Sequence, residues 1–317
     1  MNLFQIKNLA KINICILGSN KALGSNLPKA LASQGASVVL VTDDSQDLTD
    51  PAFKDTLNKI TVIDFQNPNS STALEEADII INLTLCPTPA NLNKRFNHKL
   101  NFSKNMLKKV KPQQLYIHIS PLINKNIFSF FYKTINHINE LIKHTLINYR
   151  LISIAPVASN ADSLINDINT LITKVRVFPR FKNKDFPVAF LQRDTLITAL
   201  ILIITDYCST KEYEQQEFEL AEATATLGVL NKKISELIGV QKIRLHLPIF
   251  LIRLLRVPLR IKLQSFHSNY FQFIQLQKKS SANALSLKDL PIKIFDIDYI
   301  ITTCLRYLPK DKNEDEL

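Results

Sequence analysis

The chain has 317 residues, of which 46% are hydrophobic, and a formal net charge of +11. This composition excludes a disordered chain and supplies a core large enough for one α/β domain and a smaller lobe. The longest uncharged apolar stretch near the middle, Thr195–Thr205, is too short to span a bilayer. The first residues show neither a signal-peptide nor a transit-peptide pattern, so we expect a cytoplasmic protein.

The cysteines and histidines show no metal-ligand spacing. The four cysteines are scattered, at Cys15, Cys86, Cys208 and Cys304. None of the six histidines forms a ligand pattern with a cysteine or a carboxylate. We therefore expect four reduced thiols and no metal site.

Residues 11–44 have the order strand, loop, helix, strand. Ile12–Leu17 is a short apolar run rich in β-branched residues, which is typical of a buried parallel strand. The apolar spacing over Ala22–Gln34 predicts a helix that ends at Gly35. Ser37–Val41 is predicted to form the second strand.

The loop between the first strand and the helix has the pattern of a dinucleotide loop. The chain has only five glycines, where average usage of about 7% would give roughly 22, and three of them fall in this unit. Glycines let the backbone approach a diphosphate, and the tip of a helix offers it free amides. The predicted cofactor contacts in the loop are Gly18, Asn20, Lys21, Ala22, Leu23 and Gly24.

Two features qualify this dinucleotide site. Lys21 stands where a third glycine is usual, and its side chain either pairs with a phosphate or takes the place of one. Asp43 and Asp44 follow the second strand, where an acidic residue binds a ribose 2′-hydroxyl and repels a 2′-phosphate. Asp43 or Asp44 thus favours NAD over NADP.

The alternation of strands and helices continues along the chain. Further strands are predicted at Ile60–Asp64, Asp78–Leu83, Leu115–Ile119 and Arg150–Ile154, and helices at Asn93–Val110 and Phe128–Asn148. This order predicts a doubly wound parallel Rossmann sheet. We expect an NAD(P)-binding domain over residues 1–212 and a smaller, mostly helical lobe over residues 213–317.

Five segments resemble the atypical and extended short-chain dehydrogenases of the NAD-dependent epimerase/dehydratase type. They are Ile14–Gly24, Ile63–Phe65, Ala77–Leu83, Ile117–Ser120 and Pro187–Asp194. The resemblance implies that Asp64 and Phe65 lie at the adenine, and that Leu83 and Thr84 line the cofactor cleft.

The tail is similar to one subgroup of that family, the NAD(P)H-binding accessory subunit of respiratory complex I and its bacterial relatives. The similarity lies in Ala282–Ile292 and Ile300–Leu308, although Pro291 stands where the subgroup usually has a glycine. It implies a partner among the subunits of a membrane oxidoreductase.

The expected active site is degenerate. Short-chain dehydrogenases pair a tyrosine with a lysine four residues later on one helix face, where the ammonium lowers the pKa of the tyrosine. Here Tyr132 is followed at that spacing by Asn136, and Lys133 lies about 100° round the helix. Ser120 holds the place of the family's serine pair, and His118 is expected to be half-buried and hydrogen-bonded beside it.

A basic apolar segment, residues 248–262, is the second feature that indicates a function. Its stripe of positive charge consists of Arg253, Arg256, Arg260 and Lys262, and no acidic residue occurs between Glu236 and Asp289. Such a helix either packs in a core with an arginine edge or docks on a partner or an anionic lipid surface at the inner face of the membrane. No nucleic-acid motif accompanies it, so nucleic acid is not an expected partner.

These features predict a nucleotide-binding protein with little or no catalytic activity, acting as an accessory or assembly component of a membrane oxidoreductase of the complex I type. The alternative is an active NAD(P)-dependent reductase, epimerase or dehydratase on a sugar nucleotide or a hydrophobic carbonyl. A third reading is a pseudoenzyme that binds another protein and no nucleotide.

Overall fold

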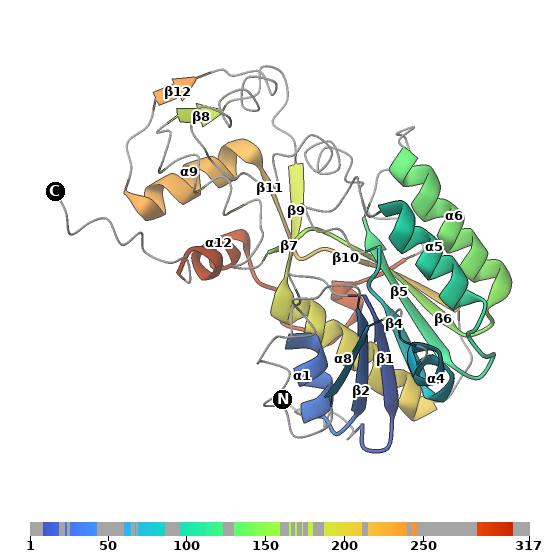
Figure 1. Ribbon diagram of the computed structural model, residues 1–317. Helices are drawn as coiled ribbons and strands as arrows, with labels where there is room; N and C mark the ends of the chain where they lie inside the picture. The colour runs from blue at the N-terminus through green and yellow to red at the C-terminus, as the bar shows by residue number, and fades with distance from the viewer. Residues whose placement is uncertain are drawn as a thin grey trace.

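An eight-stranded sheet forms the centre of the molecule (Figure 1). The computed structural model describes residues 9–18, 23, 26–42, 60–64, 67, 69–85, 96–122, 130–158, 165, 169, 173, 177–179, 187–210, 215–239, 243–245 and 284–306. The strands, in spatial order, are β3 (Ile60–Asp64), β2 (Ser37–Thr42), β1 (Asn13–Leu17), β4 (Ile79–Asn82), β5 (Leu115–Pro121), β6 (Tyr149–Ile154), β10 (Gln215–Leu220) and β13 (Leu285–Ser286). All neighbouring strands are parallel, and the order reverses between β1 and β4. The predicted doubly wound parallel sheet is confirmed.

Helices cover both faces of this sheet. On one face lie α1 (Asn26–Ser33) and α8 (Arg193–Thr210), and on the other α4 (Asn69–Glu76), α5 (Phe96–Leu107) and α6 (Phe130–Thr145). Because both faces are covered, the central strands are buried along their whole length, which explains their continuous apolar sequence.

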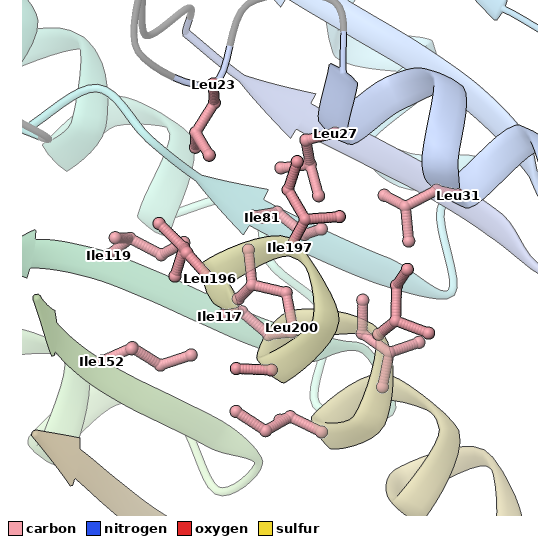
Figure 2. Packing of buried hydrophobic residues seen from close by; sticks show 14 of the residues in the cluster. Leu23, Leu27, Leu31, Ile81, Ile117, Ile119, Ile152, Leu196, Ile197 and Leu200 are labelled. Carbon is pink, nitrogen blue, oxygen red and sulfur yellow. The ribbon is translucent and has the colours of Figure 1, made fainter. Parts of the chain in front are cut away.

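The side chains of each strand alternate between two cores. Along β5, Ile117 and Ile119 point to the core under α1 and α8, whereas Tyr116 points to the core under α5 and α6. Figure 2 shows the first core, where Leu27 and Leu31 of α1 face α8 and the isoleucines of β4 and β5. Full burial of one such side chain contributes about 1.5–3 kcal/mol.

Helix α1 begins later than the sequence predicts. The predicted start at Ala22 is wrong, because the helix begins at Asn26. Leu23 lies in a turn, and its carbonyl oxygen accepts a hydrogen bond from the Asn26 amide at 3.1 Å. Its end is confirmed: Gly35 has a φ of 101°. The Gly35 amide donates to Ala32 and the Ala36 amide to Leu31, which is the Schellman arrangement.

Smaller elements follow the sheet. A three-stranded sheet contains β7 (Val157–Ala158), β9 (Pro187–Gln192) and β11 (Ala223–Thr226), and β8 (Val177–Pro179) pairs with β12 (Ile243–Leu245). The remaining helical elements are α9 (Leu227–Ile238), η2 (Leu287–Asp289) and α12 (Ile297–Arg306). Strands β10 and β13 extend the main sheet from the carboxyl side of residue 212, and the domain boundary near that residue stays a prediction.

No helix within the described residues combines the length and the apolar character needed to cross a bilayer.

Candidate functional site

The carboxyl ends of β1 and β4 lie side by side where the strand order reverses, which is the position at which open parallel sheets bind ligands. Backbone hydrogen bonds fix the chain here. The Gly18 amide donates to Val41 at 2.7 Å, and the Leu83 amide donates to Leu17 at 2.8 Å. The loops that leave β1 and β4 therefore start from defined positions.

Gly18 packs directly against Thr84. Its φ is 79°, in the left-handed region that favours glycine. A Cβ on Gly18 would lie 3.0 Å from Cγ2, 3.1 Å from Cα and 3.2 Å from the amide nitrogen of Thr84. Two of these atoms are backbone, so a Cβ at this position would require the Thr84 backbone to shift by a few tenths of an ångström.

Asn82 holds Thr84 in this place. Its side-chain oxygen accepts from the Thr84 amide at 3.0 Å and from the Thr84 hydroxyl at 2.6 Å. Its side-chain nitrogen donates to Ser103 Oγ of α5 at 2.7 Å and to the Tyr116 hydroxyl of β5 at 2.6 Å. Asn82 is fully buried, and all four of its hydrogen-bonding positions are used.

Sequence reasoning missed this network, although one signal was present. Asn82 is a polar residue that ends a run of three isoleucines in a strand buried on both faces. A buried amide requires partners, so its position predicts a polar network without identifying the partners.

Tyr116 and His118 place two more polar side chains behind the site. Burial raises the pKa of Tyr116 to about 12, against the opposing effect of hydrogen bonds with Asn82 and Ser103, so the phenol stays neutral. His118 lies opposite Asn82 in the pairing of β5 with β4. The expectation that His118 is half-buried and hydrogen-bonded is wrong: it is fully buried, and neither ring nitrogen has a hydrogen-bond partner among the described residues. Burial lowers the pKa of His118 to about 4, so the ring is neutral at pH 7.

The three residues predicted for the active site come from two adjacent elements. Ser120 lies near the end of β5, 2% exposed, on the same strand face as Tyr116. Tyr132 and Asn136 lie one turn apart in α6, which packs on that face of the sheet. Asn136 is exposed, as is Lys133, and the Tyr132 side chain is outside the described residues.

The remaining predicted cofactor residues are only partly described. Leu23 is buried in the core with Leu27, so its side chain packs against protein (Figure 2). Asp64 ends β3 opposite Thr42 of β2, and it is partly exposed. The predicted residues outside the described part of the chain are Asn20, Lys21, Ala22, Gly24, Asp43, Asp44, Phe65, Arg253, Arg256, Arg260 and Lys262.

Among the described residues, no group of histidine, cysteine, aspartate and glutamate side chains could hold a metal ion.

Comparison with solved structures relates this fold to nucleotide-dependent enzymes. Triphenylmethane reductase of Citrobacter sp., solved with NADP(H), aligns with a TM-score of 0.69 at 14% identity, over 92% of this chain and 100% of that chain. A nucleoside-diphosphate-sugar epimerase of Staphylococcus aureus aligns with a TM-score of 0.61 at 12% identity, over 94% of this chain and 97% of that chain. The UDP-N-acetylglucosamine 4-epimerase of Methanobrevibacter ruminantium was solved with UDP-N-acetylmuramic acid. It aligns with a TM-score of 0.59 at 13% identity, over 93% of this chain and 96% of that chain.

No protein-family model matches the chain, and no curated protein matches it in sequence. At these identities the structural alignments establish the fold. The chain has an α/β Rossmann-like fold, which it shares with these epimerases and this reductase.

Proposed function

We propose that the chain binds a nicotinamide dinucleotide, NAD or NADP, at the carboxyl ends of β1 and β4. The contact of Gly18 with Thr84 carries the proposal, because it holds the loops that leave β1 and β4 together at the switch point, where open parallel sheets bind nucleotides. Gly18, Leu83 and Thr84 would contact the cofactor from the described part of the site, with Asn82 behind them. The NADP(H) bound to the Citrobacter reductase supports a nicotinamide dinucleotide as the ligand.

NAD is proposed as the preferred dinucleotide. The support is the sequence position of Asp43, one residue beyond β2, where a carboxylate would repel a 2′-phosphate. Asp64, at the end of the neighbouring strand β3, is proposed to lie near the adenine, on the resemblance to the family.

Binding is tested on freshly purified full-length protein. We expect native mass spectrometry to show a bound dinucleotide, or NADH fluorescence to report binding that ADP-ribose displaces, since ADP-ribose carries the diphosphate and the adenosine. NADPH is expected to bind more weakly than NADH. Absence of bound dinucleotide, together with no binding of either cofactor at millimolar concentration, would refute the proposal.

Hydride transfer by the bound dinucleotide is proposed to be slow. The nicotinamide would supply the hydride, and the chain would have to supply a proton from Tyr132, the tyrosine of α6. The family's lysine, whose charge lowers the pKa of the tyrosine, is replaced by the neutral Asn136. Ser120 leaves one hydroxyl near the end of β5 to orient a substrate carbonyl.

The alternative, an active reductase, epimerase or dehydratase, is favoured by the fold of the structural neighbours. Turnover assays with aldehydes, quinones and UDP-sugars separate the two. A large loss of turnover in Tyr132→Phe with any of these substrates would establish the enzyme and overturn the proposal of slow chemistry.

The accessory role at a membrane oxidoreductase of the complex I type is a finer proposal. Its support is the similarity of Ala282–Ile292 and Ile300–Leu308 to that subgroup, together with the basic apolar segment. Fractionation of native membranes tests it: the protein should migrate with a large membrane complex and be released by high salt. Recovery only as a free monomer would contradict it.

A further inference from the structure

Glu222, in the corner between β10 and β11, receives three hydrogen bonds from other parts of the chain. Its carboxylate accepts from the Gln192 amide at 2.9 Å, from the Thr195 hydroxyl at 3.0 Å and from the Phe295 amide at 2.8 Å. Its own amide donates to the Phe190 carbonyl at 2.8 Å. One partly buried side chain thus joins three segments.

Two of the three donors belong to the start of α8. Gln192 immediately precedes this 18-residue helix and Thr195 lies in its first turn. The first turn of a helix carries free amides and a partial positive charge, which a carboxylate stabilises. Hydrogen bonds to an ionised acceptor are roughly twice as strong as neutral ones. The charge of Glu222 is therefore suited to this position.

The third donor ties the end of the chain to the same carboxylate. Phe295 lies in residues 292–296, which form neither helix nor strand and lead directly into α12. A backbone amide in such a segment has no partner from regular secondary structure. Glu222 supplies that partner from 73 residues away in the sequence.

Besides this attachment, α12 packs against α9 and β11. It is a 10-residue helix, too short to be stable by itself in water. Its buried side chains are Ile300, Ile301 and Cys304, and it packs beside α9 (Figure 1). In the ion pair of Lys233 with Asp298 the carboxylate is exposed and the lysine partly exposed, and such pairs near the surface contribute little.

We infer that Glu222 is a latch that fastens the segment 292–306 to the start of α8, so that this segment detaches locally when the carboxylate is lost while the parallel sheet stays folded. The inference rests on the described contacts alone and holds whether or not the chain binds a dinucleotide.

Hydrogen exchange of the full-length protein, followed by mass spectrometry, tests the latch. The variants are Glu222→Ala, which removes the acceptor, and Thr195→Val, which removes one donor at nearly constant volume. Glu236→Gln is the matched control, because Glu236 forms an exposed pair with Lys232 in α9. Peptides from residues 284–306 report on the latch, and peptides from β4 and β5 report on the sheet.

We expect Glu222→Ala to speed exchange in residues 292–306 by about tenfold or more, since a hydrogen bond to a charged group is lost. Thr195→Val should act in the same direction more weakly, and Glu236→Gln should leave exchange unchanged. Unchanged exchange in residues 292–306 of a folded Glu222→Ala protein would overturn the inference, as would equal acceleration in β4 and β5. If Glu222→Ala does not fold, unchanged exchange in Thr195→Val overturns it.

Discussion

The side-chain oxygen of Asn82 accepts hydrogen bonds from both the amide and the hydroxyl of Thr84, at 3.0 and 2.6 Å. A single buried amide thereby sets the path of the loop after β4. That loop in turn lies against Gly18 at the end of β1, so the geometry of the candidate site depends on a residue that need not touch a ligand.

Asn82→Ala should destabilise the protein strongly. The change leaves polar atoms of Thr84, Ser103 and Tyr116 buried without their partner, at about 1–3 kcal/mol for each such group. Urea unfolding followed by circular dichroism measures the loss. Ser103→Ala, which leaves one buried donor of Asn82 without its partner, should cost less, about 1–3 kcal/mol in total. Equal effects of the two variants would contradict the central place of Asn82.

Gly18→Ala is expected to damage both the fold and dinucleotide binding. The added Cβ meets the Thr84 backbone and requires an L-residue at a φ of 79°. Gly239→Ala is the matched control, because Gly239 has a φ of 68° but nothing within 4 Å of an added Cβ.

The control should cost about 1–2 kcal/mol, the cost of the backbone conformation alone, and leave NADH binding unchanged. Gly18→Ala should cost more and weaken NADH binding about tenfold or more, because the Thr84 backbone, which is proposed to line the cofactor site, must shift to admit the Cβ. Denaturant midpoints and NADH titrations give the two quantities. Unaltered NADH affinity in a folded Gly18→Ala protein would show that the cofactor does not bind beside Gly18.

The sheet could be predicted because its strands carry their own signal. Ile79–Ile81 and Leu115–Ile119 are apolar at every or almost every position, as burial on both faces requires. Helix α4 was missed because its sequence is polar and it buries only Ser70 and Leu74. Strand β13 has two residues, and only its pairing with β10 makes it a strand.

For the candidate site, too, the sequence predicted some residues and not others. Gly18 and Thr84 were predicted, since the loop pattern and the family resemblance are local features of the sequence. The partners of Asn82 were not, because Ser103 and Tyr116 lie 21 and 34 residues away and meet it only through the packing of α5 and β5. The Glu222 contacts escaped for the same reason, since they join residues 27 to 73 positions apart.

Buried His118 should make the protein sensitive to mild acid. Burial lowers its pKa from the ordinary 6.5 to about 4 in the folded state, so between these values the unfolded chain binds a proton that the folded chain does not. The contribution of the neutral His118 to the free energy of unfolding is therefore fully present above pH 6.5. It falls by about 1.4 kcal/mol per pH unit as the pH drops toward 4.

His118→Leu removes this effect and an unsatisfied buried polar group. Its free energy of unfolding should vary less between pH 6.5 and pH 4 than that of the wild type. The exposed His137 provides the control: His137→Gln should keep the wild-type slope. If His118→Leu also keeps the wild-type slope, His118 is not the group whose protonation causes the loss of stability in acid.

Asn136→Lys should raise the rate of hydride transfer if the missing ammonium limits catalysis. The new lysine would stand four residues after Tyr132, on the same face of α6, and its charge would lower the pKa of the phenol. Because Asn136 is exposed, the longer side chain meets no packing constraint there. General acid–base catalysis typically contributes about 10²–10⁴-fold, so an increase of about tenfold or more is expected. NADH consumption with a panel of carbonyl substrates measures it.

His137→Lys moves the ammonium about 100° round the helix and should give no increase. If neither variant is faster than the wild type, the residue at position 136 does not limit hydride transfer.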